Sequence, residues 1–196
     1  MIVRYRIDNS DRIVEVNDGW TAFAESNEGS MLAPSLVVGR ALTEFVTDLA
    51  TLQLYSAIFS RIRRGGGPIG FSFRCDAPAR RRLLAMAMSA DGSGGIWFNV
   101  TSVAEEAREP VTLLEMDQQR DARLISMCGW CKRVAIPGGW SEVEQAVKEL
   151  GLFIGETLPM ISHGMCPDCY AAMDAALEDT AEWKEPRIGL ILPSSA

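Results

Sequence analysis

The sequence holds a single histidine, His163, and no apolar run near the ~18 residues that a membrane-spanning helix needs. One histidine leaves no basis for most His-dependent catalytic triads. The short apolar runs lead us to expect no membrane partner. Residues 1–6 alternate apolar and basic side chains and lack the apolar core of a signal peptide. We therefore expect a cytoplasmic protein of bacterial type.

Other catalytic signatures are also missing. The sequence has no Gly-x4-Gly-Lys-Ser/Thr phosphate loop, no Gly-x-Gly-x-x-Gly and no His-Glu-x-x-His. It also lacks the pattern of a kinase or cyclase domain and any helical motif that reads DNA. These absences predict a protein that is not an enzyme.

Positive charge is scarce in the second half of the chain. The 196 residues are 47% apolar and 23% charged, a globular composition whose length allows one large domain or two small ones. Residues 1–110 carry 12 Lys and Arg against 13 Asp and Glu, whereas residues 111–196 carry 7 against 13. Modules that bind nucleic acid are usually basic, because contacts to phosphate dominate their affinity. We therefore expect no nucleic-acid partner.

Four of the five cysteines form two C-x2-C pairs, Cys128 with Cys131 and Cys166 with Cys169. Two such pairs supply four thiolates, the ligand set of a tetrahedral structural zinc site. Five cysteines in a cytosolic chain also indicate metal or redox chemistry rather than disulfides. We predict that Cys128, Cys131, Cys166 and Cys169 bind one zinc ion in a closed, structural site. We interpret Cys75 as a small buried side chain in a strand.

Alternatives to structural zinc stay open at these cysteines. The same thiolates could hold an iron–sulfur cluster, or could act as a redox switch whose oxidation ejects zinc. His163 stands three residues before Cys166. We interpret it as a hydrogen-bond donor to a cysteine sulfur or a carbonyl beside the metal. A ligand that replaces one cysteine and a solvent-facing, pH-sensing group are the other interpretations.

The pattern around the cysteine pairs predicts a treble-clef-like zinc module. The first pair lies in a turn, and Pro167 places the second pair in the first turn of a helix. A helix start directs free N–H groups at thiolates. Ser141 and Glu144 match a capping box for a helix over residues 142–150.

The first hundred residues indicate an α+β fold with an antiparallel sheet. Alternating runs at residues 2–7 and 13–16 predict a hairpin, and apolar residues at helical spacing predict a long helix over residues 48–64. Three further strands are expected, with turns between them, at residues 69–75, 82–89 and 95–103.

This order of elements resembles that of a PAS domain. The segments VNDGWTAFA, VVGRALTEFV and FRCDAPARRRLL also resemble a bacterial PAS subfamily across residues 1–105. The resemblance implies a sensory domain, a homodimer and a PAS-like antiparallel sheet with flanking helices, with a pocket for a small-molecule ligand between sheet and helices. Histidine-ligated haem is excluded by the absence of histidine before His163, and no light-sensing flavin motif is present. The alternative to a ligand is that the candidate lining residues simply pack the core: Trp20, Phe23, Phe45, Tyr55, Phe59, Phe71, Phe73 and Trp97.

The cysteine half carries a second resemblance. A cysteine pair followed by Lys132, then Trp140, then the segment Ser162–Cys169 is similar to a zinc-binding tail found on bacterial PAS sensors and response regulators. The expected organisation has four parts: a PAS-like domain at 1–105, a charged connector at 106–127, a zinc module at 128–182 and a tail at 183–196. Within the connector we expect a helix over Gln118–Leu124.

These observations predict a non-enzymatic sensory or regulatory protein that relays a signal to a separate, unidentified signalling protein. A redox or metal sensor that acts through the zinc thiolates is the alternative. A nucleic-acid-binding zinc protein is the least favoured, because of the acidic second half.

Overall fold

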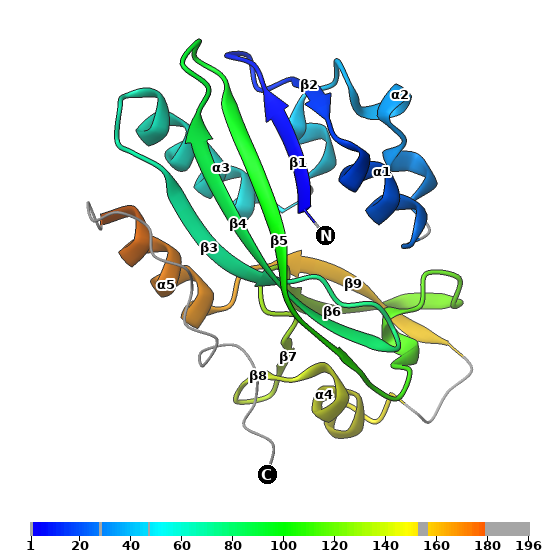
Figure 1. The fold of residues 1–196 in the computed structure, drawn as a ribbon. Helices are drawn as coiled ribbons and strands as arrows, with labels where there is room; N and C mark the ends of the chain where they lie inside the picture. The colour runs from blue at the N-terminus through cyan, green and yellow to red at the C-terminus, as the bar shows by residue number, and fades with distance from the viewer. Residues whose placement is uncertain (1, 28, 47, 153–156, 179–196) are drawn as a thin grey trace.

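A five-stranded antiparallel sheet fills the first half of the chain, with strand order β2-β1-β5-β4-β3. The computed structural model describes residues 2–27, 29–46, 48–152 and 157–178. We call the described residues up to 107 the first unit and those from 108 to 178 the second unit (Figure 1). The elements of the first unit are β1 (Ile2–Ile7), β2 (Ile13–Val16), α1 (Asp18–Glu25), η1 (Ser30–Leu32), α2 (Pro34–Val37), η2 (Leu42–Phe45), α3 (Leu49–Arg63), β3 (Ile69–Arg74), β4 (Arg80–Ala90) and β5 (Ile96–Ala107).

The predicted order of strands and helices in the first unit is confirmed. Local chemistry explains where its two main helices begin. The Asn17 side chain accepts hydrogen bonds from the backbone N–H groups of Trp20 (3.0 Å) and Arg4 (2.9 Å), which ties the start of α1 to β1. Asp48 accepts from the N–H of Thr51 at 2.8 Å and caps α3.

An aromatic cluster joins the sheet to the helices that cover one of its faces (Figure 1). Tyr5 stacks on Phe98 with ring centroids 4.4 Å apart, and Trp20 of α1 meets Tyr5 edge-on at 5.2 Å. Phe59 of α3 meets Phe98 edge-on at 5.8 Å. Burial of these rings by α1 and α3 makes this face of the sheet the centre of the core.

The second unit is built on a smaller sheet with strand order β8-β7-β6-β9, in which β6 and β9 run parallel. Its elements are η3 (Thr112–Leu114), β6 (Arg120–Cys128), β7 (Val134–Ile136), β8 (Gly139–Ser141), α4 (Val143–Glu149), β9 (Leu158–Gly164) and α5 (Pro167–Glu178). The predicted helix that opens at Pro167 is confirmed. None of the described helices combines the length and apolar character needed to cross a membrane.

Two local predictions for the second unit are wrong. Gln118–Leu124 is not a helix, because strand β6 begins at Arg120 and pairs with β9. The Arg120 side chain donates to the carbonyl oxygens of Pro159 and Leu113, which holds this extended segment in place. The Ser141–Glu144 capping box does not form, since α4 has Glu142 at its N-cap without a side-chain hydrogen bond.

The structure does not test the expected domain boundaries, although some of them lie near the ends of strands. Strand β5 ends at Ala107, and most of β6 falls inside the expected connector at 106–127. The expected tail at 183–196 lies outside the described residues. Cys75 follows the last residue of β3 and is half-buried, so the expected buried position in a strand is not what the structure shows.

Candidate metal centre

Strand pairing in the second unit brings the two cysteine pairs together. Cys128 is the last residue of β6 and lies opposite Gly164 of the parallel strand β9. Cys131 follows in the turn after β6, while Cys166 immediately precedes α5 and Cys169 lies in its first turn. The parallel pairing of β6 with β9 therefore places residues 35 or more positions apart at one point.

The four sulfur atoms form a compact group. All four Sγ atoms lie within 4.8 Å of one another, and those of Cys131 and Cys166 are 3.6 Å apart. A Zn–S bond of about 2.3 Å gives a tetrahedron with edges of roughly 3.8 Å, so this separation suits a four-thiolate site. The cysteines are free thiols; Cys128, Cys131 and Cys166 are buried, and Cys169 is half-buried. The group could hold a metal ion, and its donor set fits zinc.

Backbone N–H groups support negative charge at this point. The N–H of Cys166 donates to Cys128 Sγ at 3.4 Å. The turn after Cys128 is closed by the N–H of Lys132, which donates to the Cys128 carbonyl at 3.0 Å. Lys132 takes a left-handed conformation (φ 61°) that side-chain-bearing residues seldom adopt. The turn that brings Cys128 and Cys131 together therefore contains a residue in a strained backbone conformation.

The thiols share protons unevenly. The pKa of Cys128 lies far below its ordinary value, because the Cys131 and Cys169 thiols and the Cys166 N–H all donate to its sulfur. The pKa values of Cys131 and Cys169 are raised, because each keeps the proton that it donates to Cys128. A metal ion would displace these protons, so metal affinity should fall as the pH is lowered.

Cationic side chains flank the sulfur group. Arg133 donates to Asp168 of α5 at 2.8 Å, and the pKa of Arg133 is raised first by that bond and then by the nearby Cys131 and Cys166 side chains. Lys132 Nζ donates to the Gly129 carbonyl at 3.0 Å. These residues bring positive charge to a site that would hold four thiolates.

His163 lies on β9, exposed and outside the group of four donors. It borders a cavity of about 290 Å³ together with Asp48 and Lys132. Desolvation of the ring beside the cavity, and then the charge of Lys132, lower the pKa of His163. The four sulfurs come together without its ring.

Trp130, which lies between Cys128 and Cys131, anchors the site to the first unit. Its indole Nε1 donates to Thr51 Oγ1 of α3 at 3.1 Å, and its carbonyl accepts from the N–H of Arg74 at the end of β3 at 2.6 Å. Its ring lies 4.5 Å from that of Phe71. The sequence reasoning missed this residue, although a large aromatic inside a C-x2-C pair was a usable signal. Through Trp130, the cysteines join the core of the first sheet.

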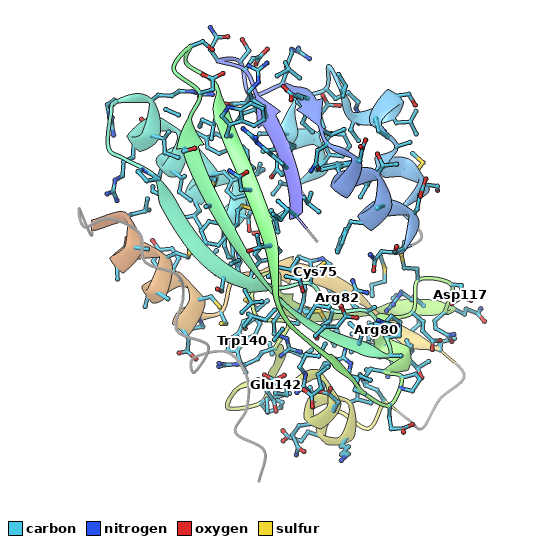
Figure 2. The ribbon with its side chains drawn as sticks, in the orientation of Figure 1. Cys75, Arg80, Arg82, Asp117, Trp140 and Glu142 are labelled. Atoms are coloured by element: carbon cyan, nitrogen blue, oxygen red, sulfur yellow. The ribbon has the colours of Figure 1, made fainter. Side chains whose placement is uncertain are left out.

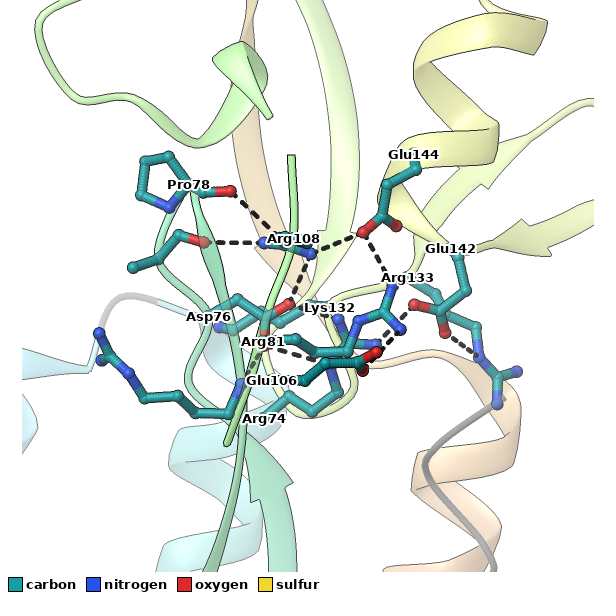
Figure 3. Close-up of polar contacts among 12 residues, drawn as sticks. Arg74, Asp76, Pro78, Arg81, Glu106, Arg108, Lys132, Arg133, Glu142 and Glu144 are labelled. Carbon is teal, nitrogen blue, oxygen red and sulfur yellow. Dashed lines mark hydrogen bonds and ion pairs between the residues drawn. The ribbon is translucent and has the colours of Figure 1, made fainter. Parts of the chain in front are cut away.

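A network of ion pairs also connects the two units (Figure 3). Arg74, whose side chain is fully buried, pairs with buried Asp76 and with Glu142 at the start of α4. Arg108 bridges Asp76 (3.2 Å) and Glu144 (2.9 Å). The Glu144 carboxylate, which was expected to cap a helix, thus forms ion pairs with arginines from outside α4.

The expected pocket of the first unit exists as a cavity of about 630 Å³ between α1 and the sheet. Trp20, Phe23 and Phe73 line it, and Cys75, Arg80 and Arg82 border it where β4 passes over the second unit (Figure 2). The other expected lining residues divide as follows: Phe45, Tyr55 and Phe71 border the 290 Å³ cavity, Phe59 is core, and Trp97 lies beneath Arg4.

Comparisons with known proteins add little beyond this geometry. No protein-family model matches the chain, and no curated protein matches it. A solved sensory box sensor histidine kinase from Vibrio cholerae is 13% identical, with a TM-score of 0.37, over 53% of this chain and 82% of that chain. A domain of an HTR-like protein from Haloarcula marismortui is 17% identical, with a TM-score of 0.29, over 53% of this chain and 98% of that chain. Because both TM-scores are low, we base the function on the residues described above.

Proposed function

We propose that this protein is a non-enzymatic sensor, in which a PAS-like domain detects a signal and a treble-clef-like zinc module carries it onward. The observation that supports this most directly is the shared core. Cys128, Trp130, Cys131 and Cys166 pack in one apolar cluster with the residues of the first sheet. A change in the first unit therefore has a packed route to the cysteines.

Phe73 is the residue at which the first unit's cavity and the cysteine region come together. It lines both the 630 Å³ cavity of the first unit and the 290 Å³ cavity that Trp130 and His163 border. A ligand that shifts the Phe73 ring would alter the packing around Trp130, and hence the turn that holds Cys128 and Cys131. Packed interiors transmit such strain because they contain little free volume.

The proposal includes zinc as the metal, a cytoplasmic homodimer and a separate signalling protein as the recipient of the signal. Native mass spectrometry of freshly purified chain should show about one zinc ion per chain and two chains per assembly. Visible absorbance near ~400 nm would replace zinc with an iron–sulfur cluster. Turnover of a substrate by the purified protein would contradict the non-enzymatic role.

Hydrogen exchange tests the coupling between the units. The Arg74 N–H donates to the Trp130 carbonyl, so it reports on the contact directly. Removal of the metal with a chelator should speed exchange at Arg74 as well as in the second unit. The Tyr5 N–H, on the central part of the first sheet, serves as the internal control. An unchanged Arg74 rate while the second unit opens would refute the coupling.

A redox sensor is the second candidate, and the half-buried Cys169 is the observation that favours it. Its sulfur lies at the accessible side of a group in which two others are 3.6 Å apart. Mild peroxide should then oxidise two of the cysteine thiolates to a disulfide. Zinc should be released, because a disulfide no longer supplies two thiolate ligands. Unchanged zinc content after peroxide treatment would leave the structural role as the one supported.

A further inference from the structure

We propose that the 630 Å³ cavity of the first unit binds a small-molecule carboxylate with an aromatic or aliphatic body, and that Arg82 is its charge partner. This inference rests on the proposed sensory function, because it names the class of signal that the PAS-like domain would receive. It follows from the walls of the cavity, from the state of Arg82 and from the charges around it.

The walls of the cavity are mainly apolar. Its volume falls within the range of about 300–1,000 Å³ that small-molecule sites occupy. Aromatic and aliphatic side chains from β1, α1, β3, β4 and β5 supply the apolar surface; they include Tyr5, Trp20, Phe23, Phe73, Leu84 and Val100. Such a lining favours a hydrocarbon or aromatic body over a sugar or a nucleotide.

Arg82 enters this wall with its charge poorly satisfied. Its side chain is nine-tenths buried, and its guanidinium carbon lies 5.6 Å from the centre of the Phe23 ring. The nearest carboxylate, Glu105, is 3.9 Å from Nε, too far for a hydrogen bond. Among the described residues, none accepts a hydrogen bond from the Arg82 guanidinium. No Arg82 nitrogen is among the fully buried unpaired atoms of the described residues, so its N–H groups are open to the cavity, where an anion would supply acceptors.

The neighbouring acids are already occupied. Glu105 accepts a hydrogen bond from Arg80, which lowers the pKa of Glu105. Asp76 is paired with Arg74 and Arg108, and it also accepts a hydrogen bond from the backbone N–H of Arg82. The charged residues that line the described part of the cavity wall are Arg80, Arg82 and Glu105, which leaves one positive charge in excess.

A carboxylate matches this site better than other anions. A guanidinium presents parallel N–H groups that fit the two oxygens of one carboxylate. A phosphate carries up to two negative charges, and the wall has only one positive charge in excess. The hydroxyl groups of Thr101 and Ser102 lie at the exposed side of the cavity, where they could donate hydrogen bonds to the carboxylate oxygens or to solvent.

Calorimetric titration of the full, zinc-loaded chain tests the proposal. The probes are octanoate and phenylpropionate, with octanol and phenylpropanol as neutral partners of the same shape. We expect both carboxylates to bind at least about tenfold more tightly than their alcohols, as a charge-assisted hydrogen bond provides. Arg82→Gln should remove that difference, and Arg82→Lys should retain part of it. Arg4→Gln is the matched control, because Arg4 lies over Trp97 on the opposite face of the sheet.

Ser102→Glu provides a second variant if Arg82→Gln does not fold. Ser102 is exposed at the cavity, so the new carboxylate should repel the probes without disturbing the core. The proposal is overturned if neither carboxylate binds, if the alcohols bind as tightly, or if a folded Arg82→Gln or Ser102→Glu variant binds the carboxylates as the original chain does. Binding of the neutral probes alone would overturn the carboxylate proposal but would remain compatible with the sensory function. Carboxylate binding without altered hydrogen exchange around Trp130 would keep this site and contradict the sensory function.

Discussion

The two units differ in what holds them together. The first unit has five hydrogen-bonded strands and a cluster of stacked aromatic rings, and its sheet is covered by two helices. The second has, among the described residues, a separate core of nine buried side chains that includes Met127 and Val143. Its remaining buried residues, including three cysteines, pack into the core of the first unit instead.

This difference shows how a small unit can be stable with little apolar surface of its own. Small domains bury too small a fraction of their surface to offset chain entropy, and metals commonly supply what is missing. Here the cysteine group, Trp130 and the Arg74 ion pairs all lie along the boundary between the units. If the cysteine group holds the proposed metal, the second unit should depend on that metal and on its docking, whereas the first should not.

The largest effect is expected from loss of the metal. Cys166→Ser removes a fully buried sulfur of the proposed zinc site, and structural zinc contributes on the order of 10–16 kcal/mol to the folding of small zinc domains. We expect loss of zinc, measured by elemental analysis, together with rapid hydrogen exchange in the second unit. Amides of β1 and β5 should stay protected.

Cys75→Ser is the matched control for this prediction. Cys75 lies outside the sulfur group, so its replacement should leave about one zinc ion per chain. Zinc retention by Cys166→Ser, or equal opening of both units, would break the contrast drawn between them.

The next largest effect is expected at Arg74. Arg74→Met leaves Asp76 buried without its closest cation and breaks the link to Glu142. Loss of one partner from a buried ion pair typically destabilises by about 3–5 kcal/mol. Denaturant unfolding should show a loss of this size.

Arg123→Met is the control for Arg74. Arg123 pairs with Asp121 at the surface of the second unit, where solvent screens the charges. The unfolding midpoint should not change for that variant. A similar midpoint for the two variants would mean that the buried network contributes little to the docking of the units.

The hydrogen bond between Trp130 and Thr51 should have a smaller effect. Thr51→Val keeps the shape of the side chain but leaves the buried indole N–H without its acceptor, which costs about 1–3 kcal/mol. Trp130→Phe removes the donor. A double-mutant cycle, measured by thermal unfolding, should give a combined loss smaller than the sum of the two. Strictly additive losses would show that the bond does not couple the units.

The smallest effect is expected in the β4–β5 turn of the first unit, away from the boundary. Asp91 accepts hydrogen bonds from the N–H and hydroxyl of Ser93, the N–H of Gly95 and the side chain of Arg6, which lower its pKa to about 2. Because this pKa is below that of the unfolded chain, the ionised group stabilises the fold above pH ~4, and the gain disappears as the pH falls towards 2.

Asp91→Asn should therefore lower the thermal midpoint at neutral pH and match the original chain below pH 2. A comparison of the two chains at each pH cancels any loss of zinc that they share. Asp174→Asn, at an exposed position on α5, is the control. A difference between the chains that persists at the lowest pH would mean that Asp91 acts through packing rather than charge.

Much of the first unit could be predicted because its signals are local. Alternation predicted β1 and β2, helical spacing predicted α3, and turn residues separated β3, β4 and β5. Alternation also implies the position of Trp97, since its neighbours Ile96 and Phe98 are both fully buried and point to the other face. The expectation that Trp97 lines the cavity was therefore wrong, because Trp97 lies on the other face of the sheet, beneath Arg4.

The second unit was harder to predict because its decisive contacts are distant in sequence. The segment from Arg120 to Leu124 contains helix-favouring residues, yet it forms a strand because β9, more than thirty residues later, supplies hydrogen bonds along its edge. Glu144 matched a capping pattern, but its carboxylate pairs with Arg81 of the first unit and with Arg108, which directly follows β5. Tertiary contacts thus overrode propensity at both places.

By itself, the sequence determined the spacing of the cysteine pairs, the helix start at Pro167 and the run of strands in the first unit. Each of these depends on residues that are close together in the chain. Only the tertiary structure decided that Trp130 docks against Thr51, that Arg82 enters the cavity without an acceptor and that the cysteines share the core of the first sheet. The physical reason is that burial and charge pairing depend on which surfaces come into contact. The separation of two residues along the sequence does not reveal whether their surfaces meet.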